Sequence, residues 1–309
     1  MIPEATNNPS RNESPDLATH GVHFSRILVG TDYSKQAGVA LKMAITIGEI
    51  FGSEISLVHA VPPFVYGEGS ELISPESLTA LLDAAKSDMK DLVASEPRLQ
   101  ALRVQTTVDY GGGADLIEHV AEKAKVNLIV VGSQGASGLE RLLLGSTAET
   151  VLRKAACPVL VAGPNCHAED HPFRSVLFAT DLESTSLQAA QYASALAGDT
   201  GGRLTVLHVV KESPGVLDEQ ADVVEARIRQ HLQKLLPADV KLFCKPKVRL
   251  EYGSPAEVII GMAESESASL IVFGLRNRRA LADHAPWSTL SHVIREAKCG
   301  ILGVHGHLP

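Results

Sequence analysis

A group of small residues in the middle of the chain has the spacing of an anion-binding loop. Gly132 and Gly135 come directly after the apolar run at residues 127–131, and Gly145 and Ser146 follow after a nine-residue spacer. The apolar run is typical of a buried strand, and glycines leave the backbone N–H groups behind it uncovered. A turn with positive φ would explain one glycine, but not three at this spacing. Uncovered N–H groups at the carboxyl end of a strand favour an anion, and we expect this anion to be the phosphates of a nucleotide.

The glycine-serine step can also begin a helix. Apolar side chains recur at helical spacing over residues 148–156, and Ser146, Thr147 and Glu149 fit a capping box in which Ser146 is the N-cap. A serine hydroxyl can accept a capping hydrogen bond and still donate to a phosphate, so the two interpretations are compatible. Glu149 would weaken the attraction for an anion unless its charge points away.

Thr31 and Asp32 are a second pair of candidate ligands. They follow the apolar run at residues 26–30, at the strand end where open α/β sheets place binding residues. The alternative for Asp32 is the N-cap of a helix that starts near Ser34. His59 follows the second apolar run, where a half-buried packing residue fits the pattern better than a catalyst. No serine, histidine and carboxylate have the spacing of a nucleophilic triad.

Two other nucleotide signatures are excluded. The three glycines at residues 111–113 follow an expected strand, but Leu116 occupies the last glycine position of the dinucleotide pattern. The lysine motif of a P-loop is absent from the sequence. We therefore expect neither a dehydrogenase nor a P-loop ATPase.

The elements that would hold these residues occur twice along the chain. Asp32 matches Asp181 at a separation of 149 residues, and Gly132 matches Gly274 at a separation of 142. Each copy alternates apolar runs with amphipathic helices, which predicts an α/β fold with helices on both faces of a parallel sheet. In the first copy we expect strands at residues 26–30, 54–61, 103–110, 127–131 and 158–162, and helices at residues 35–51, 75–95, 114–124 and 148–156.

The repeat also sets the expected domain boundaries. A polar tail at residues 1–23 precedes a first domain at residues 24–163, and a linker at residues 164–172 precedes a second domain at residues 173–306. The tail lacks the apolar core of a signal peptide, and its composition predicts disorder.

Composition excludes several classes of function. A formal net charge of −8, a pI near 5.8 and an aromatic content of 4% argue against nonspecific binding to nucleic acid or anionic membranes. No apolar run approaches the roughly 20 residues of a membrane span. Four cysteines in a chain of this length do not make a disulfide framework, and Cys166, His167 and His171 lack the spacing of a zinc site. We expect a cytoplasmic protein without a metal held by its own side chains.

With these motifs the chain resembles the universal stress protein family in its tandem two-domain form. The family signature, Gly-x2-Gly-x9-Gly-Ser, is met by Gly132, Gly135, Gly145 and Ser146. The resemblance covers nearly everything except the tail and the linker. It implies two Rossmann-like domains, each with a five-stranded sheet, and ATP as the ligand of many but not all members. Such an ATP is commonly accompanied by Mg²⁺ bound through the phosphates.

The resemblance also implies roles for single residues. Thr31 and Asp32 would lie near the adenosine, and the backbone of Ala60 would meet the adenine. The ribose and phosphates would lie against the glycine unit and its neighbours, which are Val131, Gly132, Ser133, Gly135, Gly145, Ser146 and Thr147. Subunits of the family often pair through the fifth strand. Residues 159–161 would then pair with residues 301–304 inside one molecule, as a pseudo-dimer, and a homodimer of whole chains stays open.

The second copy departs from the signature. Gly274 is kept, but Asn277 and Trp287 stand where the first copy has Gly135 and Gly145. Asn tolerates a positive φ, whereas an indole is too bulky where backbone and phosphate must approach closely. We therefore expect the second domain to have lost ATP.

Three functional hypotheses follow from the sequence. The first is an ATP-binding regulatory protein of the stress response, with one nucleotide site in the first domain and protein partners that the sequence does not identify. The second is an interaction scaffold that binds no nucleotide. The third is a slow ATPase or phosphotransferase, and it ranks last because no general base stands out near the glycine unit.

Overall fold

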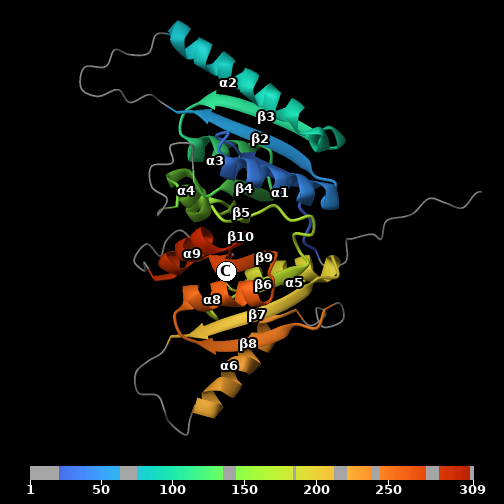
Figure 1. Cartoon of the computed structure of the whole chain (residues 1–309), viewed down its shortest axis with the longest axis vertical. Coiled ribbons are helices and arrows are strands. Elements are labelled where there is room, and N and C mark those ends of the chain that lie inside the picture. Colours follow the sequence, from blue (N-terminus) through green and yellow to red (C-terminus); the bar gives the residue numbers. More distant parts are fainter. Residues whose placement is uncertain are drawn as a thin grey trace, which may run out of the picture.

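The computed structural model describes residues 21–62, 75–134, 144–183, 186–211, 221–237, 244–275 and 285–306. Two successive sets of strands and helices make up this part of the chain (Figure 1). The first set is β1 (Arg26–Gly30), α1 (Lys35–Phe51), β2 (Glu54–Val61), α2 (Pro75–Ser95), the 3₁₀ turn η1 (Pro97–Ala101), β3 (Arg103–Tyr110), α3 (Gly113–Lys123), β4 (Leu128–Gly132), α4 (Ser146–Lys154) and β5 (Val159–Ala162). The second set is β6 (Ser175–Ala179), α5 (Ser186–Asp199), β7 (Arg203–Val210), α6 (Ala221–Leu235), β8 (Lys247–Tyr252), α8 (Pro255–Ser265), β9 (Leu270–Leu275), α9 (Ala285–Glu296) and β10 (Gly300–His305).

The described strands form one ten-stranded sheet in the order β3-β2-β1-β4-β5-β10-β9-β6-β7-β8. Strands within each half pair in parallel, and helices connect them. The central strands are buried on both faces, as their near-continuous apolar runs require. The predicted α/β fold with two repeated units is therefore confirmed, and the strand and helix bounds of the first half lie within two residues of those expected.

The two halves join through their fifth strands. β5 and β10 pair antiparallel, with Leu160 opposite Leu302, Val161 opposite Ile301 and Val159 opposite Gly303. Leu160 and Leu302 are equivalent positions of the repeat, so a pseudo-two-fold axis passes between them, as in an isologous dimer interface. The pairing expected inside one molecule is therefore present.

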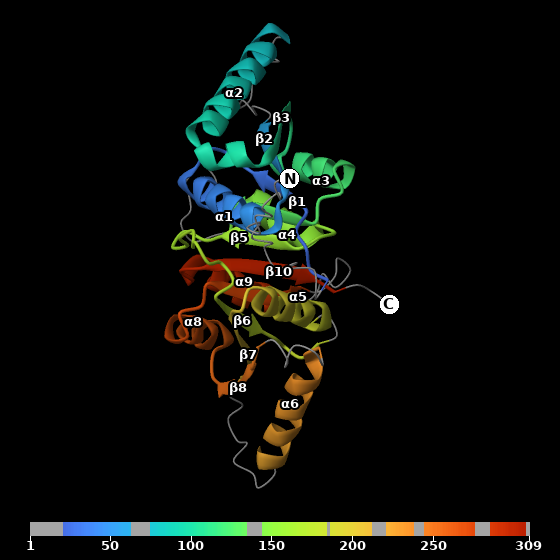
Figure 2. The ribbon, with the colours of Figure 1, turned by 90° about the vertical axis from the view of Figure 1, so that its right-hand side faces the viewer.

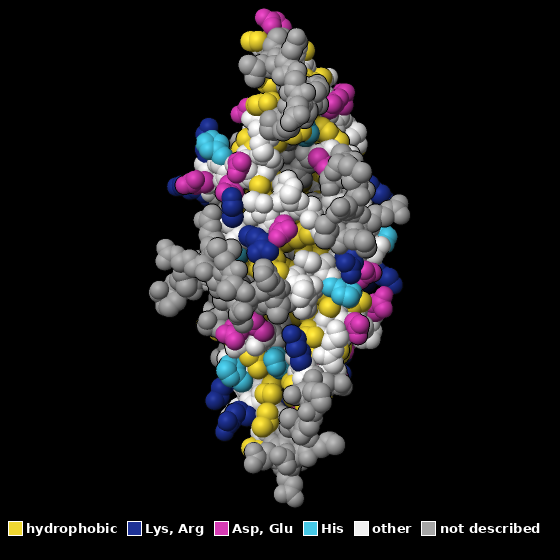
Figure 3. All heavy atoms as spheres, turned by 90° about the vertical axis from the view of Figure 1, so that its left-hand side faces the viewer, with side chains coloured by type: hydrophobic (Ala, Val, Ile, Leu, Met, Phe, Trp, Pro, Cys, Tyr) yellow, Lys and Arg dark blue, Asp and Glu magenta, His cyan; other side chains and the backbone are white. Residues whose placement is uncertain are grey.

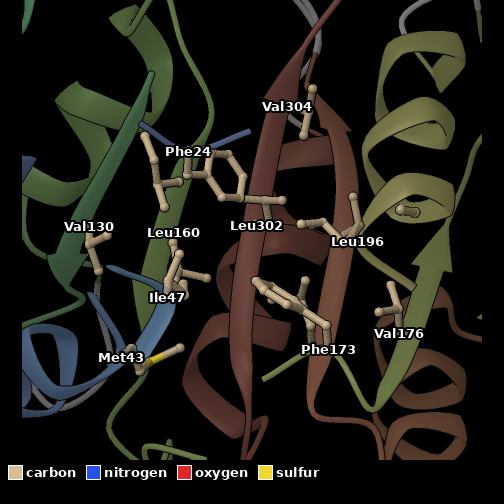
Figure 4. Packing of buried hydrophobic residues seen from close by; sticks show 14 of the residues in the cluster. Phe24, Met43, Ile47, Val130, Leu160, Phe173, Val176, Leu196, Leu302 and Val304 are labelled. Atoms are coloured by element: carbon tan, nitrogen blue, oxygen red, sulfur yellow. The ribbon is translucent and has the colours of Figure 1, made fainter. Parts of the chain in front are cut away.

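Helices of both halves cover each face of this sheet and enclose two cores. One core lies under α1, α2, α5 and α6, and the other under α3, α4, α8 and α9. Figure 4 shows residues of the first core on either side of the junction, with Ile47 and Leu160 from the first half and Leu196 and Leu302 from the second. Figure 2 shows α2 and α6 extending outward at the two ends of the long axis. Each core thus continues through the junction.

The segment between β5 and β6 packs against the second half. Asn165 Nδ2 donates to Arg295 O at 3.1 Å, and the backbone N–H of His167 donates to Lys298 O at 3.2 Å. Cys166 is buried, and its Sγ lies 3.8 Å from Met43 Sδ. All four cysteines are free thiols. Within the described ranges, no helix has the length and apolar character of a membrane span.

Candidate functional site

The carboxyl ends of β1 and β4 lie side by side at the centre of the first half. β1 pairs with β2 on one side and with β4 on the other, so the chain order reverses between β1 and β4. In open α/β sheets, ligands bind in the crevice outside the carboxyl ends of the strands at such a switch point. The candidate residues Thr31 and Asp32 follow β1 and Ser133 follows β4, so the fold brings them to one edge of the sheet.

The loop after β1 is held by hydrogen bonds of its own side chains. Thr31 is buried, and its Oγ1 accepts from the backbone N–H of Tyr33 at 3.1 Å. Asp32 Oδ1 accepts from the N–H of Ser34 at 3.0 Å, and Ser34 Oγ accepts from the N–H of Ala37 at 3.2 Å. Ser34 is therefore the N-cap of α1, and the alternative that assigned the cap to Asp32 is wrong. Asp32 lies in the loop before the cap.

Tyr33 is an unexpected feature of this loop. Its φ is +62°, in the left-handed region that a residue with a Cβ seldom adopts. Its hydroxyl donates to Ala85 O in α2 at 3.1 Å, and its ring centroid lies 4.5 Å from that of His59. Tyr33 is not predictable as a site residue, because neither its conformation nor its contact with α2 has a local sequence signal.

His59 and Ala60 follow the buried part of β2. The Nδ1 atom of His59 lies 2.8 Å from Thr31 O, and the N–H of Thr31 donates to Val58 O at 2.9 Å. These bonds tie the end of β2 to the β1 loop, with Ala60 half-buried immediately beyond them. His208 makes the same 2.8 Å contact with Thr180 O in the second half. The histidines are half-buried, as expected of packing residues.

Gly132 is required by close packing between a strand and a helix. A Cβ at this position would lie 2.9 Å from Ala37 N and 2.9 Å from Gln36 C, in the first turn of α1. Gly132 is not one of the described glycines with a positive φ. The alternative that explained this glycine by a turn with positive φ is therefore wrong. Gly132 is needed because its lack of a side chain lets α1 lie against the end of β4. The preceding residue, Val131, is buried in the core on the α4 side of the sheet.

Ser133 joins the end of β4 to the start of α4. Its N–H donates to Ala162 O at 2.9 Å, and its own carbonyl accepts from the N–H of Gly145 at 2.7 Å. The residue is 2% exposed, and its buried Oγ has no hydrogen-bond partner within the described part of the chain. Gly132 and Gly145 are thus brought together, whereas Gly135 lies outside the described residues.

The first turn of α4 differs from the expected capping box. The N-cap is Gly145, Ser146 is the exposed first helical residue, and no described side chain caps this end. Glu149 Oε1 instead accepts a hydrogen bond from Arg153 Nε at 2.9 Å and forms an ion pair with Arg153 Nη2 at 2.8 Å. The capping-box prediction is wrong, because the backbone enters the helix one residue earlier. The helix N-terminus consequently keeps N–H groups for an anion, and the charge of Glu149 is paired.

A second helix N-terminus lies beside the first. A Cβ at Gly113, the first residue of α3, would lie 3.1 Å from Thr147 Oγ1 in the first turn of α4. Gly112 is the N-cap of α3, and it too lacks a capping side chain among the residues described. This glycine run fails the dinucleotide pattern and was therefore not among the predicted site residues. The sequence signal for this second helix end is the run of glycines at residues 111–113 directly before an expected helix.

The second half repeats the β1 loop, including the contact of its aspartate with the backbone two residues later. Leu182, the counterpart of Tyr33, has a φ of +66°, and its N–H donates to Thr180 Oγ1 at 3.0 Å. Asp181 Oδ1 accepts from the N–H of Glu183 at 3.0 Å and from Ser186 Oγ at 3.1 Å. This carboxylate is engaged by the start of α5.

Trp287 lies at the junction between the halves. The guanidinium carbon of Arg153 is 4.0 Å from the centroid of its indole ring. This described contact is with α4 of the first half, and the expected loss of ATP from the second half stays a prediction. Asn277 lies outside the described residues.

Taken together, the doubled parallel sheet and the loops at its switch points define a tandem Rossmann-like α/β protein. The family model described as the universal stress protein family matches residues 23–163 and 172–305. The two matches include nearly all of both halves, so the chain belongs to the universal stress protein family.

Individual relatives agree with this assignment. The chain is 38% identical over 147 residues to a universal stress protein of Methanocaldococcus jannaschii, with 45% of this chain and 81% of the relative covered. It is 27% identical over 295 residues to one of Mycolicibacterium smegmatis, with 90% of this chain and 96% of the relative covered. A solved universal stress protein of Archaeoglobus fulgidus DSM 4304 has the same fold, with a TM-score of 0.69 at 19% identity, and 92% of this chain and 99% of that chain covered.

Proposed function

We propose that the chain is an ATP-binding regulatory protein of the stress response, with its nucleotide site in the first half. The observation that carries the proposal is the 2.7 Å hydrogen bond from the Gly145 N–H to Ser133 O. This bond brings the N-terminus of α4, which lacks a described side-chain cap, to the carboxyl end of β4 beside the β1 loop. A triphosphate is the anion that suits such a position next to a crevice at a switch point.

Each candidate residue has a role in this proposal. The N–H groups of Ser146 and Thr147 would bind the phosphates, and the unpartnered Oγ of Ser133 would gain a partner. Asp32 would bind the ribose or base, and the backbone of Ala60 would contact the adenine edge. Mg²⁺ would be held by the phosphates. Among the described residues, no three His, Cys, Asp or Glu side chains form a group that could hold a metal ion without them.

Charge and cysteine chemistry fit a nucleotide-dependent protein of the cytoplasm. Acidic and basic side chains are interspersed over the face in Figure 3, and the net charge of −8 does not favour nucleic acid. Burial raises the pKa of Cys166 and of Cys299 to about 12, so these thiols are protonated at neutral pH. Four unpaired thiols favour a reducing compartment, and we propose a cytoplasmic location on that ground.

Calorimetric titration with ATP and Mg²⁺ tests the proposal. We expect about one site per chain, because Trp287 replaces the motif glycine in the second half. Gly145→Trp, which copies the second half into the first, should abolish binding. Gly261→Trp is a matched control, because a Cβ at Gly261 has no atom within 4 Å. Absence of binding, or two equal sites, would reject this function.

Hydrolysis of ATP is tested on the same samples. The proposed function needs binding and release, but no turnover. Phosphate release that disappears in both Asp32→Asn and Ser146→Ala would favour the slow ATPase instead. Release that is unchanged by both substitutions would identify a contaminating enzyme.

A further inference from the structure

Helix α4 contacts the second half as well as the core of its own half. It has nine residues, and a helix of this length is marginal without tertiary contacts. Two contacts with the second half occur near its carboxyl end. The Nε2 atom of His305 lies 2.8 Å from Leu152 O, and the guanidinium of Arg153 lies 4.0 Å from the centre of the Trp287 ring. Figure 1 shows α4 and α9 facing each other beside the β5–β10 junction.

The contact with Trp287 continues to the first turn of α4. Arg153 stacks on the indole and also donates to Glu149 Oε1 from Nε at 2.9 Å. Glu149 is the acidic residue of the first turn, and its N–H donates to Gly145 O at 2.9 Å. Trp287, Arg153 and Glu149 therefore form a continuous chain of contacts from α9 to the candidate phosphate site. An unpaired Glu149 carboxylate would oppose an anion at the same helix end.

The repeat gives this contact a further meaning. Trp287 occupies the position that Gly145 has in the first half, 142 residues earlier. The side chain that breaks the glycine motif of the second half is the one that packs on the phosphate-site helix of the first half. Trp287 therefore both breaks the glycine motif of the second half and packs on the helix that follows the glycine motif of the first.

We propose that Trp287 and Arg153 are positioning residues for the phosphates of the nucleotide, so that the second half holds the phosphate-binding helix of the first. This inference rests on the proposed function. Trp287 keeps the Arg153 guanidinium in place, and Arg153 neutralises Glu149 and fixes the first turn of α4. Neither residue contacts the base in this scheme, so the effect is specific to the phosphate part of the ligand.

Titration of Trp287→Ala with two ligands tests this inference. Removal of a cation–π partner should weaken ATP–Mg²⁺ binding by about threefold to tenfold. Binding of adenosine, which has no phosphate, should stay within the error of the titration. Trp287→Phe keeps an aromatic face and should retain most of the ATP affinity. Tyr252→Phe is the control within the second half, because Tyr252 is exposed and its hydroxyl bonds Glu225 far from α4.

A double-substitution cycle separates this coupling from a general loss of stability. Arg153→Gln should weaken ATP binding, and Trp287→Ala should have little further effect in the Arg153→Gln background. Equal weakening of ATP and adenosine by Trp287→Ala would overturn the inference, because it would indicate general loosening of the first half. Unchanged ATP affinity in Trp287→Ala would also overturn it and would leave the proposed function intact. Absence of ATP binding in the unaltered chain would instead reject the proposed function, and the inference with it.

Discussion

Single residues of the candidate site are under packing constraints as well as binding constraints. Gly132 belongs to the family signature, yet its immediate neighbours are backbone atoms of α1 rather than an open space. A motif glycine can thus be required for the fold of the site and for ligand access at once. Substitution at such a position changes both the fold of the site and ligand access. The stability of each variant therefore has to be measured together with its ligand affinity.

Gly132→Ala should lower the free energy of unfolding by about 1–3 kcal/mol, because the new Cβ overlaps the first turn of α1. Gly38→Ala is the control. Gly38 lies in α1, the helix that Gly132 packs against, and a Cβ at Gly38 meets nothing within 4 Å. This substitution should raise stability by about 0.5–1 kcal/mol through helix propensity. Denaturant unfolding of both variants measures the difference, and equal effects would contradict the packing argument.

Tyr33 predicts a dependence of stability on alkaline pH. Burial, and secondarily the charge of Asp88, raise its pKa from 10.0 to about 12, so the folded state favours the neutral phenol. This contribution is fully present below pH 10 and is lost as the pH rises toward 12. Unfolding free energies between pH 9 and about 12 should fall less steeply for Tyr33→Phe than for the unaltered chain. Parallel curves would show that the phenol makes no such contribution.

At the scale of elements, the β5–β10 pair decides how the repeat is assembled. A fifth strand with one free edge would expose unpaired N–H and C=O groups. The antiparallel pairing of Leu160 with Leu302 satisfies both edges and extends two five-stranded sheets into one. The same pairing brings α4 and α9 into contact through Arg153 and Trp287.

Leu160→Ala should cost about 2–5 kcal/mol of unfolding free energy, because a fully buried leucine at the junction leaves a cavity. Leu187→Ala is the control, since Leu187 is 51% exposed. Its effect should stay within about 0.5 kcal/mol. Chemical denaturation provides the comparison, and a small loss for Leu160→Ala would mean that the junction repacks.

At the scale of the whole molecule, the two cores shared by both halves lead us to expect that the halves unfold together. Each core contains residues of both halves, such as Leu160 with Leu302 in one and Val161 with Ile301 in the other. Unfolding of one half would therefore expose apolar surface on the other. The tandem arrangement is one cooperative structure by this argument, even though its sequence consists of two copies.

Equilibrium unfolding followed by two probes tests this cooperativity. Trp287 is the single tryptophan of the chain, and its fluorescence reports the junction, whereas far-ultraviolet circular dichroism reports helices of both halves. The two transitions should coincide. A circular dichroism transition with two steps, only one of which changes the fluorescence, would show that the halves unfold separately.

Much of this fold could be predicted because its signals are patterns within the sequence itself. The alternation of apolar runs with amphipathic helices predicted the parallel sheet, and matching residues such as Asp32 and Asp181 predicted two copies. The site was predicted less completely. Ser146 was expected to be the N-cap of α4, but the structure assigns that position to Gly145. The same short motif is compatible with several backbone conformations. The hydrogen bond from the Gly145 N–H to Ser133 O selects one of them.

The sequence alone determined the repeat, the α/β fold and the family, because periodicity, motif spacing and internal similarity are visible without knowing which segments pack together. Only the tertiary structure decided what lies against each motif residue. The approach of α1 to Gly132, of α3 to Thr147 and of Trp287 to Arg153 joins segments far apart in the sequence. Such contacts depend on how complete elements pack, and packing is a property of the whole folded chain.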